Sequence, residues 1–131
     1  MGLGGVAGMT TITQFLLARI AEDEAVARAA SLGPWHVNPE SDEVLAVDDI
    51  TVCDAFALSG PQLRATTAHI ARHDPARVLA EGAAKRAVVW LYNSESEYER
   101  GDYGQGVEDA LLRLATPYAE HPDYDAEWSA K

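Results

Sequence analysis

The sequence is short of cysteine and of long apolar runs. Cys53 is the one cysteine among 131 residues, so an internal disulfide cannot form and nothing indicates an oxidising compartment. No apolar run approaches the roughly 20 residues that cross a bilayer, and no basic segment precedes an apolar core as in a signal peptide. We therefore expect a cytoplasmic protein without a membrane partner.

Basic residues are also scarce. The chain has 10 Lys and Arg against 21 Asp and Glu, which gives a net charge of −11 at pH 7. Residues 95–127 hold ten acids and two bases, whereas residues 64–86 hold five bases and two acids. A negative protein repels phosphate backbones, so we expect no nucleic-acid partner. The acidic final third is typical of a solvated face, and the alternative is a surface that docks a basic protein or mimics DNA.

Apolar residues, in contrast, are plentiful enough for a core. They make up 47% of the sequence, as in ordinary globular proteins, and a chain of 131 residues can bury a core without cross-links. The glycine-rich residues 1–9 show no periodicity. We predict a disordered leader over residues 1–9 and a single α+β domain over residues 10–131.

The domain is predicted to begin with a helix. Thr11 and Gln14 have the spacing of a capping box, in which each side chain accepts a hydrogen bond from the other residue's backbone N–H. Apolar residues continue at helical spacing to about Ala30. Gly33, which has access to left-handed geometry, and Pro34, which cannot continue a helix, mark its end.

The next segment is predicted to form a sheet. Three short β-prone stretches, at residues 35–37, 44–47 and 50–53, are separated by residues typical of turns. Asp48 and Asp49 can turn the chain between the second and third stretches. We predict a small three-stranded antiparallel meander.

The second half is predicted to be helical. Ser59 has the chemistry of an N-cap for a helix that ends near His73. Asp74 can cap a further helix, and Pro75 suits its first position because the missing N–H costs nothing there. This longest helix extends to roughly Glu99, and so short a joint predicts a steep angle between the two helices.

The longest helix has one residue that departs from a regular pattern. Its predicted inward face consists of Val78, Leu79, Ala83, Ala87, Trp90 and Leu91. Gly82 costs about 1 kcal/mol against alanine, so either a neighbour packs closely there or the helix is locally weak. Glycines at 101, 104 and 106 predict a loop before a further helix over residues 107–115, and a last short turn or helix is predicted to start at His121. The predicted fold class is α+β: an N-terminal helix, a small three-stranded antiparallel sheet, then three to four helices.

His69 and His73 form one candidate site. They lie four residues apart and share a face of a helix, which is a spacing typical of zinc ligands. The helical zinc-protease motif needs a glutamate directly after the first histidine, and Ile70 stands there instead. The alternative is that both histidines serve the helix joint. Candidate third ligands are Asp74, His121 and Asp123.

A second candidate site lies near the end of the sequence. Its residues combine aromatic rings, acidic groups and a histidine: Tyr118, His121, Asp123, Tyr124 and Trp128. Such a segment could dock a protein partner. Aromatic residues near a chain end also often tie the tail onto the core, and we favour that interpretation.

The remaining reactive residues favour structural roles. Trp35 and His36 point to opposite sides of a strand, so we expect a core tryptophan beside a surface histidine. Cys53 has no nearby base and is expected to be a small buried apolar residue rather than a nucleophile. No phosphate-binding glycine loop and no nucleophile motif is present. We predict no catalytic residue and no cofactor.

Several motifs together resemble a known family. They are Phe15-Leu16, Glu22 to Glu24, Gly33 to Val37, His69 to Leu79, Lys85-Arg86, Pro117 to Tyr124 and Glu127-Trp128. In this combination the chain resembles a small uncharacterised family of actinobacteria and their phages, and Gly82 departs from the regular charged helix of its members. The resemblance carries over no catalytic residue. It implies an actinobacterial or phage origin and an accessory role.

The function best supported at this point is that of a non-enzymatic accessory protein that binds another protein, and the oligomeric state stays open, a homo-oligomer included. Two alternatives remain. One is a metal-binding or metal-dependent hydrolytic protein centred on His69 and His73. The other is an acidic inhibitor or DNA mimic that uses residues 95–127.

Overall fold

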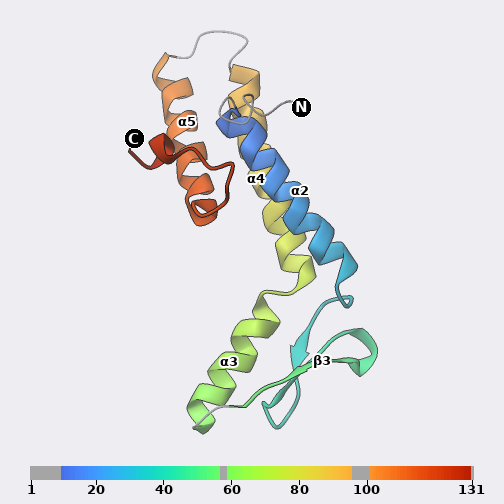
Figure 1. The fold of residues 1–131 in the computed structure, drawn as a ribbon. Coiled ribbons are helices and arrows are strands. Elements are labelled where there is room, and N and C mark those ends of the chain that lie inside the picture. Colours follow the sequence, from blue (N-terminus) through green and yellow to red (C-terminus); the bar gives the residue numbers. More distant parts are fainter. Residues whose placement is uncertain (1–9, 57–58, 96–100, 131) are drawn as a thin grey trace. The chain divides into compact units, whose positions relative to one another are not determined.

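The described part of the chain begins with a capped helix. Thr11 Oγ1 accepts a hydrogen bond from the Gln14 N–H at 3.0 Å, and Gln14 Oε1 accepts one from the Thr11 N–H at 3.1 Å. This reciprocal cap starts helix α2 (Ile12–Ala29), as the sequence predicts. The computed structural model describes residues 10–56, 59–95 and 101–130 (Figure 1). The predicted leader at residues 1–9 lies outside these residues.

Contacts between residues divide the chain into two compact units. The first unit comprises residues 1–22 and 83–131, and the second comprises residues 23–82. Over the described residues, the order is one helix, a three-stranded antiparallel sheet, and then further helices. This α+β order confirms the predicted fold class. The single domain over residues 10–131 stays a prediction.

The core of the first unit lies between α2, α4 (Pro75–Glu95) and α5 (Gly101–Ala115). Phe15 and Leu16 of α2, Val89 of α4 and Leu111 of α5 are each at most 1% exposed. Such close burial of large apolar side chains is the main stabilising contribution to a small unit. The remaining members of the buried cluster are Ile12, Ile20, Leu112 and Ala115.

The buried face of α4 differs from the predicted one within the first unit. Val89 is buried, and Val88 and Tyr92 pack against the core. These positions follow the i, i+1 and i+4 spacing of one helix side. Four residues predicted to face inward are exposed instead: Ala83, Ala87, Trp90 and Leu91. The prediction was wrong because it placed the large tryptophan inward, whereas the neighbouring valines fill the core.

Helix α5 begins six residues before its predicted start. The three glycines expected in a loop, at positions 101, 104 and 106, lie inside the helix, and Gly104 is buried. Gln105 Nε2 donates a hydrogen bond to Asp109 Oδ1 one turn later, at 3.1 Å. Each helical glycine costs about 1 kcal/mol against alanine. Tertiary packing of the apolar side of α5 outweighs this cost, which local propensity cannot show.

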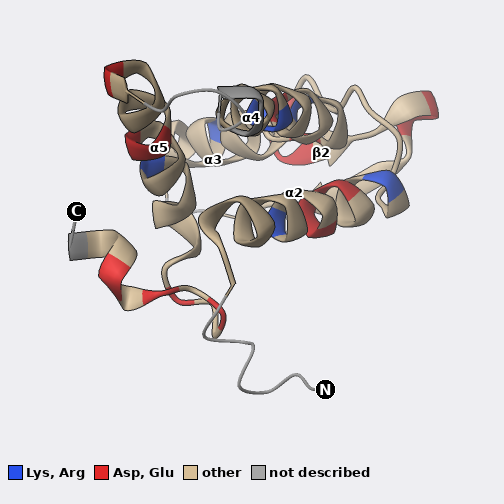
Figure 2. Ribbon diagram, turned by 90° about the horizontal axis from the view of Figure 1, so that it is seen from above, with Lys and Arg blue, Asp and Glu red and all other residues tan. Residues whose placement is uncertain are grey.

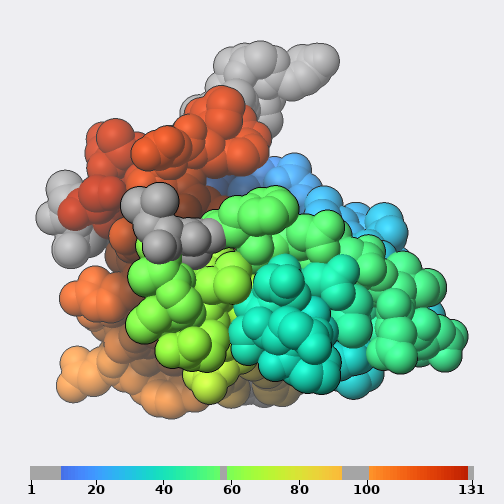
Figure 3. All heavy atoms as spheres, turned by 90° about the horizontal axis from the view of Figure 1, so that it is seen from below, coloured from blue at the N-terminus to red at the C-terminus, as the bar shows by residue number. Residues whose placement is uncertain are grey.

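The second unit contains the predicted meander. Strands β1 (His36–Val37), β2 (Glu43–Leu45) and β3 (Thr51–Asp54) pair antiparallel in the order β1-β2-β3. Helix α3 (Gly60–Arg72) packs against β1 and β2, and Figure 3 shows the sheet segment and α3 side by side. The register aligns Val37, Val44 and Cys53 across the three strands, and Val44 is fully buried.

A tight turn joins β2 to β3. The predicted second strand is shortened, because Val47 already belongs to the short helix η1 (Val47–Asp49). Asp48 and Asp49 have φ angles of 62° and 57°, in the left-handed region. Aspartate is one of the few side chains that tolerates this region, because its short carboxylate can bond locally. The predicted turn at these two residues is confirmed.

The joint between α3 and α4 also follows the sequence. Ser59 Oγ accepts the Gln62 N–H at 3.2 Å and starts α3, which ends at Arg72. Asp74 Oδ1 accepts the Arg77 N–H at 2.9 Å, and Pro75 is the first residue of α4. Both predicted caps are therefore confirmed. The steep angle stays a prediction.

Two glycines of the second unit allow close approaches. Gly33 does not adopt the expected left-handed geometry; of the described glycines, Gly101 alone has a positive φ. A Cβ on Gly33 would instead lie 3.0 Å from Asp74 Oδ2. A Cβ on Gly82 would lie 2.8 Å from Oε2 of Glu24, a buried residue. The unusual glycine in α4 therefore marks close packing.

We expect opposite effects from two glycine-to-alanine substitutions. Gly106 of α5 faces open space, so Gly106→Ala should raise the free energy of unfolding by about 0.5–1 kcal/mol through helix propensity. Gly82→Ala should lower it, because the buried Glu24 must move. Urea denaturation of both variants measures the two changes. A gain for Gly82→Ala equal to that for Gly106→Ala would contradict the close packing.

Candidate functional site

His69 lies in the last turn of α3, and His73 is the C-cap residue that follows this helix. Their ring centroids are 4.4 Å apart, and both residues are exposed. His73 Nδ1 donates to the His69 carbonyl oxygen at 2.7 Å. Because a carbonyl only accepts, this bond leaves His73 Nε2 with the lone pair that a metal needs. The histidine pair therefore offers two imidazole ligands.

Further metal ligands do not gather around the histidine pair. Within the described ranges, no group of three or more His, Cys, Asp and Glu is arranged to hold a metal ion. The carboxylate of Asp74 is already engaged with backbone N–H groups. His121 contacts Arg19 and accepts the Asp123 N–H. Metal binding at His69 and His73 stays a prediction. The alternative, that both histidines stabilise the joint between α3 and α4, also stays a prediction.

Asp74 connects two segments of the second unit. Its Oδ1 caps α4, and its Oδ2 accepts the Trp35 N–H at 3.0 Å, directly before β1. Asp74 is 8% exposed, so both bonds are shielded from water. Trp35 is half-buried rather than enclosed, and its indole Nε1 donates to the Ser31 carbonyl oxygen at 2.9 Å. The sequence predicts the cap but not the bond to Trp35.

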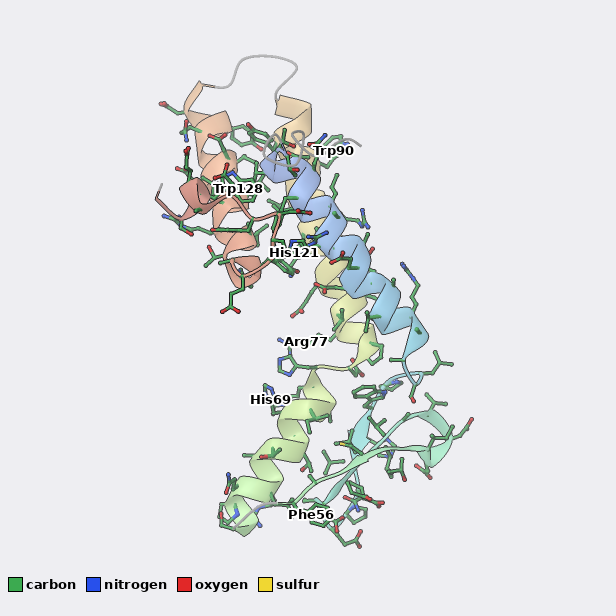
Figure 4. The ribbon with its side chains drawn as sticks, viewed as in Figure 1. Phe56, His69, Arg77, Trp90, His121 and Trp128 are labelled. Atoms are coloured by element: carbon green, nitrogen blue, oxygen red, sulfur yellow. The ribbon has the colours of Figure 1, made fainter. Side chains whose placement is uncertain are left out.

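The C-terminal aromatic segment packs onto the core of the first unit. Phe15 is its centre, with ring centroids 6.3 Å from Tyr118, 5.8 Å from Tyr124 and 5.1 Å from Trp128. Edge-to-face contacts of this kind stabilise beyond the apolar area that they bury. Figure 4 labels Trp128 and His121 on this segment. The favoured interpretation, a tie of the tail onto the core, is confirmed. Partner binding by the segment stays a prediction.

His121 of the same segment contacts a buried arginine. Arg19 is 7% exposed, its guanidinium lies 5.2 Å above the Phe15 ring, and Nη1 reaches His121 Nδ1 at 2.7 Å. Arg19 Nη2 also pairs with Glu22 at 3.1 Å. A guanidinium only donates, so the imidazole accepts through a lone pair. Four of the five predicted partner-binding residues thus contact the core or its arginine through their rings, and Asp123 does not.

Acidic residues gather at the turn between β1 and β2. Asn38 is buried, and its Nδ2 lies 2.7 Å from Asp42 Oδ1 and 3.2 Å from both Glu40 Oε1 and Glu43 Oε1. Asn38 Oδ1 accepts the N–H groups of Asp42 and Glu43, which closes the turn. One amide thus orients three carboxylates. Sequence analysis missed Asn38 because only its fit in the turn distinguishes it from any other surface asparagine.

The like charges of this cluster perturb Glu43. Asp54 stands directly opposite Glu43 in the β2–β3 ladder. The hydrogen bond with Asp54 raises the pKa of Glu43 above its ordinary value of 4.5, and burial and the charges of Asp54, Asp42 and Glu40 raise it further. Like charges directly opposite one another weaken a sheet. The sheet carries this electrostatic cost at neutral pH.

Apolar side chains remain on the surface near the acidic cluster. Ile50, directly before β3, is 57% exposed. Phe56, two residues after the end of β3, is 92% exposed (Figure 4). Leu32 is 75% exposed, and its carbonyl oxygen accepts the Val47 N–H at 3.1 Å. His36 is exposed as predicted and pairs with Asp49 at 3.2 Å. Cys53 is half-buried. The sequence does not predict the exposure of Phe56.

The acidic final third is largely exposed where it is described. Figure 2 shows acidic residues along α5 and the C-terminal segment. The exposed members are Asp102, Asp109, Glu120, Asp123 and Glu127. Their role as an inhibitor or DNA mimic stays a prediction. No helix among the described residues is both long and apolar enough to cross a membrane.

Asp74→Ala is expected to destabilise the protein more than the loss of an ordinary cap. Removing Asp74 deletes the cap of α4, worth about 0.5–2 kcal/mol, and leaves the Trp35 N–H without its acceptor, for a further ~1–3 kcal/mol. Ser59→Ala, at the exposed cap of α3, is the matched control. It should cost only about 0.5–2 kcal/mol, the effect of a lost helix cap. Urea denaturation compares them, and equal losses would show that the bond to Trp35 contributes nothing.

Glu43→Gln is expected to stabilise the protein at neutral pH only. The raised pKa means that ionisation of Glu43 costs more free energy in the folded than in the unfolded protein. The free energy of unfolding therefore falls as pH rises through the pKa that Glu43 has in the folded state. Glutamine keeps the acceptor for Asn38 without the charge. The melting temperature should rise at pH 7, and the gain should vanish below about pH 4. Glu40→Gln is the control, with a smaller gain. A gain independent of pH would refute the electrostatic origin.

No curated protein and no solved structure matches the chain at a significant level. A family model matches residues 9–130, nearly the whole sequence. Its description states no activity, which agrees with the predicted resemblance to an uncharacterised family. The chain therefore belongs to DUF6221, a family of unknown function.

Proposed function

We propose that this is a non-enzymatic accessory protein, of an actinobacterium or one of its phages, that binds another protein. One observation carries the proposal: large apolar side chains of the sheet-bearing second unit remain in water. Phe56, Leu32 and Ile50 are 92%, 75% and 57% exposed. Aromatic and aliphatic side chains of this size are typical anchors of protein interfaces.

The position of these residues supports a binding role. Ile50 and Phe56 lie at the two ends of β3, and Leu32 is linked by its carbonyl oxygen to the turn before β3. Two of the exposed side chains thus flank one short strand, and the backbone of Leu32 is bonded to the turn that precedes it. Isolated exposed apolar residues need no explanation, but an apolar group beside one element favours an interaction surface.

The test begins with capture and ends with a binding isotherm. The full chain is immobilised and exposed to an actinobacterial lysate. A protein that it captures is then purified and titrated with the full chain. We expect saturable binding to one site per chain, lost in the triple variant Leu32→Ser, Ile50→Ser, Phe56→Ser. Exposed positions tolerate such changes within about 0.5 kcal/mol of stability, so the fold should persist.

A matched variant tests whether the surface is specific. Trp90→Ser with Tyr103→Ser removes exposed aromatic residues of the first unit, which are 64% and 57% exposed. This double variant should bind the partner as the wild type does. The proposal fails if no protein binds saturably, or if the triple variant binds unchanged.

A further inference from the structure

We propose that the outer edge of β3 receives an extended, basic segment of the partner as a fourth strand. This inference rests on the proposed function and specifies how the partner is held. Addition of a strand to an open sheet edge gives affinity through backbone hydrogen bonds and specificity through side chains.

The sheet topology leaves one side of β3 open. In the order β1-β2-β3, β3 is an end strand that pairs with β2 alone among the described strands. Helix α3 packs chiefly against β1 and β2. An end strand presents a row of backbone N–H and C=O groups that another chain can pair with.

The register identifies the groups that face outward. The Ala55 N–H donates to the Asp42 carbonyl oxygen on the β2 side at 2.8 Å. Backbone groups alternate along an antiparallel strand, so those of Asp54 point away from β2. The Ala46 N–H donates to the Ile50 carbonyl oxygen at 2.7 Å, so by the same alternation the backbone groups of Thr51, which stands opposite Leu45, also point away from β2. Asp54 and Thr51 are thus the positions where a partner strand would bond.

Charge determines the kind of segment. Residues 29–63 contain no Lys or Arg but six acids: Glu40, Asp42, Glu43, Asp48, Asp49 and Asp54. Natural sheet edges are commonly protected by lysine, and this edge has none. A cation placed opposite Asp54 would make a favourable cross-strand pair and relieve its repulsion with Glu43. The segment should therefore carry Lys or Arg.

The apolar side chains beside β3 determine the length of the partner segment. Ile50 and Phe56 are six residues apart and flank the strand. At about 3.3 Å per residue, a partner segment that reaches both spans roughly 20 Å, or six to seven residues. Its apolar side chains would cover Ile50 and Phe56, with basic ones between them.

Charge argues against a second copy of this chain as the occupant. Two β3 strands paired antiparallel would bring two copies of Asp54 and Glu43 onto one sheet. Each chain also carries a net charge of −11, which opposes association. A basic heterologous segment has neither disadvantage.

The experiment uses the full chain and random octapeptides. Sequences enriched on the wild type are expected to alternate apolar residues with Lys or Arg. A synthetic enriched peptide should slow amide hydrogen exchange at Thr51 and Asp54, and its N-methylated form should not bind. Thr51→Pro, which an end strand tolerates, and Phe56→Ala should each weaken binding about tenfold.

Two controls separate charge and surface effects. Asp54→Asn should weaken binding several-fold and reduce its salt dependence, whereas Asp102→Asn in the first unit should not. Val26→Ala, at a residue that is 71% exposed on α2, should leave binding unchanged. Enrichment of acidic peptides, absence of enrichment, unchanged exchange at Thr51 and Asp54, or self-association through β3 would each overturn the inference.

Failure of this inference differs from failure of the proposed function. If the captured partner binds the wild type, does not bind the triple serine variant, and still binds Thr51→Pro with unchanged affinity, the partner uses the apolar side chains without adding a strand. If no partner binds saturably, the proposed function itself fails.

Discussion

The second unit depends on one buried carboxylate. Asp74 caps α4 with Oδ1 and holds the backbone before β1 with Oδ2. Because it is buried, neither bond competes with water, and loss of the carboxylate would leave two backbone donors without partners. Gly33 accommodates this arrangement, since any side chain there would contact Oδ2. A helix start and a strand start, 39 residues apart, are thus fixed by the same group.

The two units contrast in how their aromatic, apolar and charged residues are used. In the first unit, the C-terminal rings surround Phe15 and His121 meets Arg19, so most of this chemistry serves packing. In the second unit, Ile50 and Phe56 remain exposed beside a strand whose acidic pair lacks a basic neighbour in the sequence from 29 to 63. Unsatisfied apolar surface and uncompensated charge at one place favour an interaction over a purely structural role.

The family match is consistent with this distribution of features. Membership of a family of unknown function supplies no catalytic residue. The described residues offer a histidine pair, an aromatic tail and an acidic sheet edge, and only the last combines open backbone groups with exposed apolar side chains. The proposed binding role follows from that combination rather than from any single motif.

The sequence by itself determined what depends on neighbours along the chain. The capping box at Thr11 and Gln14, the caps Ser59 and Asp74, the turn at Asp48 and Asp49 and the order of elements are local, because each rests on bonds within a few residues. Only the tertiary structure decided which side of α4 is buried, that α5 continues through three glycines, and that Asp74 also bonds Trp35. It likewise decided that Phe56 is exposed. These outcomes depend on contacts between distant segments, where packing outweighs local propensity.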